Sequence, residues 1–358
     1  MCDVPALRFS ELTEEWKDTT LDNECTINPT SDKLKAEFVY IDLESVEKGE
    51  LTKKQVIEKA NAPSRAQRVL QNGDVLFQCV RPYQKNNYLV KDVSPEIQWV
   101  ASTGYAQLRT KKNNPAFIYH LLNTSSFNKK VIVRCTGSSY PAINSDDLSK
   151  IHFYTCGIEE QKRIADFLSL LDERIATQNK IIEKLETLIK GIVEKTFVSS
   201  QYVTLQHYSP IITSGKDQNS GGNYPLYGST GVIGSVLNPS YNKPIVLIAR
   251  VGSIGNVQYV TAPCGISDNT LIIDAGEDNR FIYYYLNGYN FSHIISGTTQ
   301  PLITASSVKK IEIPVIEKHR RKKIVSTLYA IEQKLRNEKY IAYLLSRQKY
   351  FLLSQMFI

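Results

Sequence analysis

Residues that would mark a metal centre or a disulfide framework are sparse in this sequence. It has six cysteines but no C-x-x-C pair, and its five histidines show no ligand-like spacing, so the sequence indicates neither a zinc site nor a disulfide framework. The cysteines are Cys2, Cys25, Cys79, Cys135, Cys156 and Cys264. We expect them to be reduced thiols, as in a cytosolic protein.

Signatures of catalysis are also missing. The sequence contains no G-x-x-x-x-G-K-[ST], no H-E-x-x-H, no G-x-S-x-G and no H-x-E followed by C-x-x-C. A glycine-rich stretch, GSTGVIG from Gly228, lacks the G-x-G-x-x-G spacing of a dinucleotide-binding turn and is more typical of a hairpin. These absences favour a binding role over catalysis and indicate no metal and no cofactor in this chain.

Long hydrophobic runs are absent as well. No stretch approaches the roughly 18 consecutive apolar residues of a membrane-spanning helix. The first residues, MCDVPALRFSELTEEW, lack the basic region and following apolar region of a secretion signal. We therefore expect a soluble, cytoplasmic protein with no membrane partner.

Length and charge limit the remaining possibilities. The 358 residues, 42 % of them hydrophobic, are enough for two domains with separate cores. The 43 lysines and arginines exceed the 36 acidic residues and give a net charge of +7. Such a mild excess suits a nucleic-acid partner without requiring one.

An internal repeat decides the predicted organisation. GSSYPAINSDDLSKI from Gly137 and GTTQPLITASSVKKI from Gly297 are variants of one phrase, 160 residues apart. Matches at the same offset continue without a gap as far as Phe197 and Phe357. A duplication of this length predicts two similar domains.

The repeat also extends towards the N-terminus of each half. FIYHLLN at Phe117 matches FIYYYLN at Phe281, and GDVLFQCVRP from Gly73 resembles PIVLIARVGS from Pro244. The latter pair are apolar, β-rich runs with an arginine near the end. Each half is therefore predicted to contain strands, a short helix, a polar loop and a long helix.

Apolar residues recur at alternating steps of four and three in both long helical segments, the spacing of a coiled-coil seam. Glu159 and Glu160 favour a helix start near Ile158, where carboxylates interact well with the helix dipole. Gln178 interrupts the first seam, and Glu338 and Lys349 fall on the second, so we expect the second to be weaker or shifted. The candidate residues for helix pairing and partner docking are Ile164, Leu168, Leu171, Ile175, Ile182, Leu185, Ile324, Leu328, Ile331 and Leu335.

A long helix with an apolar stripe needs a partner. The duplication offers one in the same chain: the two helices can pair antiparallel, set the halves at opposite ends and relate them by a pseudo-twofold axis. Duplex DNA offers the same symmetry. The alternatives are that each helix packs on its own domain or that two chains dimerise through the helices.

Polar loops in the two copies differ while their frame repeats. Ser138, Ser139 and Tyr140 in one half stand where Thr298, Thr299 and Gln300 stand in the other, each triplet between a glycine and a proline. Hydroxyls and amides bind phosphates or base edges, and glutamine suits the adenine edge. The triplets are therefore candidate DNA contacts for two different half-sites; an ordinary polar turn is the alternative.

A second candidate set follows the repeated apolar strands: Arg81, Tyr83 and Lys85 in the first half, and Arg250 and Ser253 in the second. Arginine there can bind guanine with two hydrogen bonds or hold a phosphate. A surface ion pair is the alternative for both arginines.

A basic run, KHRRKK from Lys318, lies at the start of the second long helix, where cations oppose the helix dipole. A DNA backbone or an acidic partner would compensate it, and a solvated basic turn is the alternative.

These segments together resemble the specificity subunit of type I restriction-modification systems. The likeness spans essentially the whole chain, and the order and doubling of the segments are specific to that family. The segments are ALRFSELTEEW, GDVLFQCVRPY, TGSSYPAINSDDLSKI, EEQKRIADFLSLLDERI, YPLYGSTGVIG, PIVLIARVGSIGNV and SGTTQPLITASSVKKIEIPV. The second helical region departs from the pattern, because it begins EKHRRKK where the first has IEEQKR.

The resemblance implies an α+β chain with two mixed α/β target recognition domains, at residues 1–156 and 201–316, and two long antiparallel helical spacers, at 157–200 and 317–358. Each domain reads one half of a split site in double-stranded DNA. The helices fix the unread gap and dock two modification subunits, which carry S-adenosylmethionine and methylate adenine. Restriction subunits, which use ATP and Mg, join that assembly, and the specificity subunit itself catalyses nothing.

Two other classes remain open. A self-contained methyltransferase or nuclease would bind S-adenosylmethionine or cleave DNA on its own. A non-catalytic adaptor with duplicated domains would hold protein partners and show no preference for a DNA sequence.

Overall fold

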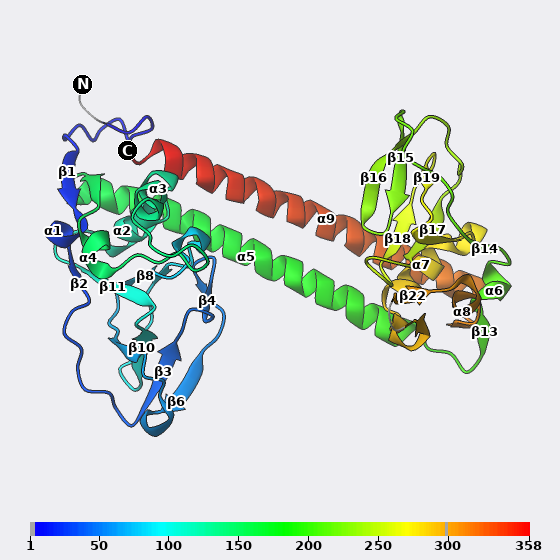
Figure 1. Ribbon diagram of the computed structural model, residues 1–358, viewed down its shortest axis with the longest axis horizontal. Coiled ribbons are helices and arrows are strands. Elements are labelled where there is room, and N and C mark those ends of the chain that lie inside the picture. Colours follow the sequence, from blue (N-terminus) through cyan, green and yellow to red (C-terminus); the bar gives the residue numbers. More distant parts are fainter. Residues whose placement is uncertain (1–3, 298–299) are drawn as a thin grey trace. The chain divides into compact units, whose positions relative to one another are not determined.

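The computed structural model describes residues 4–297 and 300–358, and the chain divides into two compact units. Unit 1 comprises Met1–Gln178 with Ile341–Ile358, and unit 2 comprises Asn179–Tyr340. Helices α5 (Ile158–Thr196) and α9 (Lys318–Gln355) are each continuous and contribute residues to both units (Figure 1). Helix α5 begins at the predicted Ile158. In the described ranges no helix has the length and apolarity that crossing a membrane requires.

Unit 1 contains two four-stranded sheets. The first is antiparallel and has the order β2 (Cys25–Ile27), β11 (Tyr105–Thr110), β8 (Val75–Gln78) and β9 (Tyr88–Leu89). The second has the order β6 (Gln55–Glu58), β3 (Glu37–Ile41), β10 (Gln98–Ser102) and β7 (Ala66–Val69), with β10 parallel to β3. Smaller elements complete it: β1 (Lys17–Thr20) with β12 (His152–Thr155), β4 (Val46–Glu47) with β5 (Glu50–Leu51), and α1 (Leu21–Glu24), α2 (Pro115–Leu122), α3 (Ser125–Ile132) and α4 (Ser145–Ser149).

Unit 2 repeats this plan with a smaller second sheet. Its antiparallel sheet has the order β14 (Ile212–Ser214), β20 (Thr270–Ile273), β17 (Ile245–Ala249) and β18 (Val257–Val260). The other has three strands, β16 (Gly231–Val236), β15 (Tyr224–Gly228) and β19 (Gly265–Ile266), and the hairpin of β15 and β16 confirms the interpretation of GSTGVIG. The remaining elements are β13 (Tyr202–Thr204) with β23 (Glu312–Pro314), β21 (Ile295–Ser296) with β22 (Leu302–Ile303), and α6 (Leu205–Tyr208), α7 (Asn279–Asn287) and α8 (Ala305–Lys309).

The end of a long helix closes the core of each unit. Phe357, just beyond α9, packs on Phe117 of α2 in unit 1, with ring centroids 5.2 Å apart. Phe197, just beyond α5, stacks on Phe281 of α7 in unit 2 at 5.0 Å. All four rings are buried, so the repeat seen in the sequence is a repeat of packing.

A residue near the start of each long helix also ties it to an earlier short helix, α2 in unit 1 and α7 in unit 2. Gln161 accepts a hydrogen bond from Asn114 N, at the N-cap of α2, and donates one to Cys156 O. Arg321 pairs with Asp278, at the N-cap of α7, and donates to Ile316 O. The two units thus use an amide and an ion pair at equivalent places.

The long helices run in opposite directions within each unit, as predicted for pairing. In unit 1, Ile164 and Leu168 of α5 share a core with Leu352 of α9, and Lys349 pairs with Asp172 at 2.5 Å. The same core includes residues of α2, so the first seam positions pack on their own domain as well. Helix α5 therefore both pairs with α9 and packs on its own domain.

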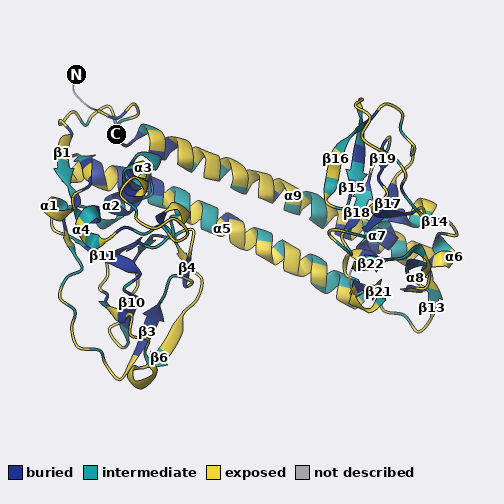
Figure 2. Cartoon of the chain, in the orientation of Figure 1, coloured by how far each residue is buried: buried dark blue, intermediate teal, exposed yellow. Residues whose placement is uncertain are grey.

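In unit 2 the last turns of α5 pack with the first turns of α9. Ile324 and Leu328 share a core with Phe197, and Lys339 pairs with Glu186 at 2.6 Å. The seam of α9 is more polar than that of α5, as predicted, but its register is not shifted. Along α9 a minority of residues are buried or half-buried and most are exposed (Figure 2). The residues spaced by four and three belong to the buried or half-buried set, and Glu338 is 5 % exposed.

The seam positions differ in burial. Those nearest the domain cores, Ile164, Leu168, Ile324 and Leu328, are buried. The others, Leu171, Ile175, Ile182, Leu185, Ile331 and Leu335, are half-buried.

Candidate nucleic-acid interface

The two sets of loop residues predicted in the first half meet in unit 1. Arg81 N donates to Pro141 O at 2.8 Å, and Val80 forms a bridge with Ala142. The segment after β8 therefore lies beside the loop that carries Ser138, Ser139 and Tyr140. The side chains of that triplet are exposed.

Arginine and tyrosine from these two loops contact each other. The guanidinium of Arg81 lies 4.3 Å from the ring centroid of Tyr140, and 64 % of Tyr140 is exposed. Tyr83, in the same segment as Arg81, is also exposed. Exposed rings next to a cation give this surface both stacking and hydrogen-bonding capacity.

The Arg81 segment is held in a strained conformation. Arg81 and Lys85 have left-handed φ angles of 53° and 54°, and they flank the short helix Pro82–Gln84. The buried Gln78 stabilises the segment, because its amide donates to Gln84 Oε1 at 2.8 Å and accepts from Asn86 N at 3.1 Å. Left-handed residues other than glycine cost about 1–3 kcal/mol each and cluster at functional sites.

Lys85 is directed differently from Arg81. Its ammonium donates to Asn123 O at 3.1 Å, and burial lowers its pKa. This hydrogen bond fastens the segment to the end of α2, so part of the donor capacity of Lys85 is used within unit 1.

The two repeated loops begin with the same turn, for which glycine is needed. Gly137 has φ 90°, and a Cβ there would lie 3.0 Å from Tyr140 O. Gly297 has φ 89°, and a Cβ would lie 2.6 Å from Gln300 O. A side chain at these positions would combine an unfavourable φ with a backbone clash.

In unit 2 the corresponding loops also meet. Arg250 O accepts from Ile303 N at 3.0 Å, next to the loop that carries Gln300. The guanidinium of Arg250 donates from Nη1 to Ser214 Oγ at 3.0 Å, whereas its Nε is buried and has no hydrogen-bond partner among the described residues. Ser253 and Gln300 are exposed, and Thr298 and Thr299 lie outside the described residues.

Backbone hydrogen bonds show which residues of the two units are equivalent. Cys79 N donates to Gly104 O and Cys79 O accepts from Ile143 N in unit 1. In unit 2, Arg250 makes the same pair of bonds, to Asn269 O and from Ile303 N. Arg250 therefore occupies the position of Cys79 and not that of Arg81, so the arginines in the two repeated strands do not superpose.

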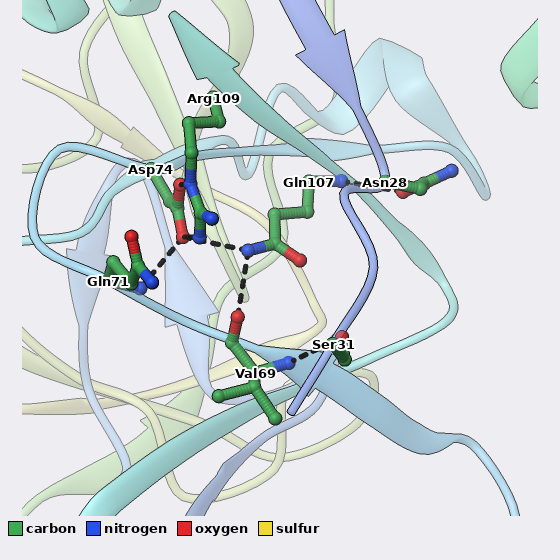
Figure 3. A network of polar contacts seen from close by, with 7 residues as sticks. All are labelled: Asn28, Ser31, Val69, Gln71, Asp74, Gln107 and Arg109. Atoms are coloured by element: carbon green, nitrogen blue, oxygen red, sulfur yellow. Dashed lines mark hydrogen bonds and ion pairs between the residues drawn. The ribbon is translucent and has the colours of Figure 1, made fainter. Parts of the chain in front are cut away.

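A buried carboxylate that no sequence motif marks, Asp74, organises the sheets of unit 1. Asp74 accepts from Arg109 Nε at 2.8 Å and Nη2 at 2.9 Å, and from Gln107 Nε2 at 2.7 Å (Figure 3). Gln107 also donates to Val69 O at 2.9 Å, which ties the end of β7 to β11. The network fixes the strands that lead into the loops. The strand pattern marks Asp74 only as a polar residue next to an apolar run.

Part of the basic run at the start of α9 is compensated within unit 2. Lys318 pairs with Glu277 at 2.9 Å, and Arg321 pairs with Asp278 at 3.0 Å. His319, Arg320 and Lys323 are exposed. No group of three or more potential metal ligands occurs among residues 4–297 and 300–358.

A family model matches most of the chain in two segments. The model for the type I restriction modification DNA specificity domain matches residues 14–187 and 194–343. The predicted MjaX type I restriction enzyme specificity subunit of Methanocaldococcus jannaschii is 25 % identical over 378 residues, covering 90 % of this chain and 88 % of that protein. The HindI specificity subunit of Haemophilus influenzae is 24 % identical over 173 residues, covering 47 % of this chain and 34 % of that protein.

Solved structures have the same fold. The S subunit of a type I restriction-modification system from M. genitalium matches with a TM-score of 0.70 and 18 % identity over 99 % of both chains. A chain from a structure of assembly and conformational transition of the type I R-M system matches with a TM-score of 0.57 and 22 % identity, over 96 % of this chain and 98 % of that one.

Proposed function

This chain belongs to the family of type I restriction-modification DNA specificity proteins, and we propose that unit 1 and unit 2 each read one half of a split DNA site through the loops described above. The curated relatives are specificity subunits, which direct a restriction-modification complex to its DNA and are not its catalytic subunits. This chain is accordingly the DNA-specificity component of such a complex.

One observation carries the assignment of the reading surface. In each unit the segment after a buried strand is hydrogen-bonded to the repeated glycine-led loop, through Arg81 and Pro141 in unit 1 and through Arg250 and Ile303 in unit 2. The frame is shared, whereas the exposed side chains on it differ. A shared frame with different side chains is what reading two different half-sites requires.

The proposed contacts follow from exposure and chemistry. In unit 1, Tyr140, Tyr83 and Arg81 offer aromatic faces and a guanidinium, and Ser138 and Ser139 offer hydroxyls. In unit 2, Gln300 offers the amide that suits an adenine edge, and Ser253 offers a hydroxyl. Thr298 and Thr299 stay candidates from the sequence, as does Lys85, whose ammonium is partly engaged.

The chain works with DNA and with other subunits of a restriction-modification system. We further propose that two modification subunits dock on it, that they carry S-adenosylmethionine, and that ATP- and Mg-dependent restriction subunits can join. Docking would use helix residues outside the seam, because the seam residues pack internally. Leu170, Leu188, Tyr350 and Phe351 are apolar and exposed on α5 and α9.

Methylation mapping tests the proposal. A host that lacks other adenine methyltransferases would express this chain with its modification subunit, and methylated adenines would be mapped across the genome. The expected result is one split sequence with a fixed gap, and omission of this chain should abolish it. Methylation without a sequence preference would favour the duplicated adaptor instead.

A further inference from the structure

Arg68, on β7 of unit 1, is a partly buried cation that the fold does not use. Among the described residues its side chain has no hydrogen bond or ion pair, and its Nε is buried without a partner. Burial lowers its pKa, and no carboxylate opposes that shift. Burying a guanidinium without an anion costs free energy of desolvation, and a bound anionic ligand would offset that cost.

Arg109 of the same unit shows what a structural arginine looks like here. Both its Nε and its Nη2 donate to the carboxylate of Asp74, and this hydrogen bonding raises its pKa (Figure 3). Arg109 is therefore satisfied inside the protein. Arg68, although also partly buried, has no such carboxylate in the part of the chain that the structure describes.

Arg68 lies close to the junction where β8 leads into the Arg81 segment. Arg68 pairs with Ala101 on β10. In the turn after β10, Thr103 N donates to Arg65 O, and Gly104 O accepts a hydrogen bond from Cys79 N. Burial raises the pKa of the Cys79 thiol to about 12, and the charge of Arg68 acts on that thiol in the opposite direction. Arg68 therefore lies on the strand beside β10, and the turn that follows β10 is hydrogen-bonded to Cys79.

In unit 2 the same junction carries Arg250, since Arg250 makes the backbone bonds that Cys79 makes in unit 1. Within residues 4–297 and 300–358, its Nε also lacks a hydrogen-bond partner. The alignment that pairs Cys79 with Arg250 pairs Arg68 with Pro239, so unit 2 has no counterpart of Arg68 itself. Each unit therefore has one incompletely bonded guanidinium on or beside the strands at this junction, from a different segment in each unit.

The strand that carries Arg68 in unit 1, β7, corresponds to a shorter pairing in unit 2. Leu70 N donates to Trp99 O beyond the end of β7, and Tyr241 N makes the equivalent bond to Cys264 O. Where β7 continues as a strand in unit 1, the described residues of unit 2 form an isolated bridge between Tyr241 and Cys264. Unit 2 thus has an arginine at this junction although its described residues form no strand equivalent to β7.

We propose that Arg68 and Arg250 each bind a phosphate of the DNA backbone, at matching places in the two half-sites. This inference rests on the proposed function and adds to it a residue and a ligand group. Bases differ between two half-sites, whereas the phosphate backbone is common to both. An arginine present in both units, near loops whose exposed side chains differ, therefore fits phosphate better than a base edge. A guanidinium also suits the two-pronged binding of phosphate oxygens.

The test uses the complex of this chain with its modification subunits and a duplex carrying the methylation-mapped site. Arg68→Ala should weaken binding about tenfold and reduce the salt dependence by about 0.9 in log–log slope, as the loss of one phosphate contact predicts. Arg68→Lys should retain most of the affinity. The preference for the mapped duplex over one with an altered half-site should not change.

A scan with single uncharged methylphosphonates locates the contact. The wild-type complex should lose affinity at particular phosphates, and Arg68→Ala should abolish the loss at one phosphate in one half-site. Arg250→Ala should abolish the loss at the matching phosphate of the other half-site. Arg68→Ala should not lower the melting temperature of the complex, whereas removal of a structural residue would.

Lys59→Ala is the control, because it removes one exposed positive charge from unit 1 without touching β7. If Arg68→Ala behaves like Lys59→Ala in affinity, slope and phosphonate scan, the phosphate assignment is wrong. A changed base preference with an unchanged slope also overturns it, since Arg68 would then read a base. A wild-type complex that binds the mapped and altered duplexes equally would instead overturn the proposed function.

Discussion

Unit 1 and unit 2 have the same arrangement of strands and helices but different polar residues. The comparison shows which residues build the shared fold and which are free to differ. Phe357 and Phe197 close the two cores alike, whereas Gln161 and the Arg321–Asp278 pair fasten the long helices differently. Backbone and apolar packing are repeated because they build the fold. Polar side chains are free to diverge wherever another set of hydrogen bonds satisfies the same groups.

The largest expected loss of stability comes from removing either of the two rings that close the cores, Phe357 and Phe197. Phe357→Ala should destabilise unit 1 and Phe197→Ala unit 2, each by about 3–5 kcal/mol, because a buried ring is replaced by a cavity. Hydrogen exchange would assign each loss to its unit. Phe351→Ala, at an exposed ring, is the control and should change stability by less than about 0.5 kcal/mol. Loss of protection in the same unit for both variants would contradict the packing repeat.

A second difference is the buried histidine His120, which should make the stability of unit 1 fall in acid. His120 of unit 1 corresponds to Tyr284 of unit 2, which donates to Glu332 at 2.9 Å. Burial, and then the charges of Lys349 and Lys91, lower the pKa of His120 to about 3. Near His120 lie Ser169 Oγ at 3.3 Å and Asp172, whose carboxylate is 3.9 Å from Nδ1.

The sign of the pH effect follows from that depressed pKa. Below the unfolded value of about 6.5 the unfolded chain binds a proton that folded His120 does not, so stability falls as the pH drops from about 6.5 towards 3. Unfolding of unit 1, followed by hydrogen exchange at several pH values, measures this. His120→Gln should flatten the dependence, and an unchanged slope in that variant would exclude His120 as its source.

The reading loops allow a reciprocal test of the comparison. Tyr140→Ala should relax one half-site and Gln300→Ala the other, with about 1–3 kcal/mol of discrimination lost where a two-pronged base contact is removed. Methylation mapping with each variant reports both half-sites at once. If one variant relaxed both half-sites, the assignment of one loop to one half-site would be wrong.

The smallest expected difference concerns the ion pairs between α5 and α9. Lys349–Asp172 in unit 1 is partly buried, whereas Lys339–Glu186 in unit 2 is about half exposed. Lys339→Ala should therefore cost less than about 0.5 kcal/mol and Lys349→Ala roughly 1 kcal/mol. Denaturant unfolding measures both, and a larger cost for Lys339→Ala would reverse the ranking by burial.

Much of the architecture could be predicted because it follows from local sequence patterns and from the internal repeat. The offset between Gly137 and Gly297 marks the repeat, and the carboxylates at Glu159 and Glu160 mark the start of α5 at Ile158. The sequence marks the Arg81 and Tyr140 segments as candidate loops but does not show that they meet. Their contact depends on strands separated by tens of residues pairing in one register.

The sequence by itself determined that this protein is a duplicated module with two long helices and polar loops at matching places, since periodicity and self-similarity require no knowledge of what lies nearby in space. Only the tertiary structure decided which side chains those loops share a surface with. It placed Arg250 at the position of Cys79, left the guanidinium of Arg68 without a carboxylate, and used Arg109 to satisfy Asp74. The physical reason is that a charged group is defined by its partners, and partners are chosen by long-range strand pairing and burial rather than by neighbours in the chain.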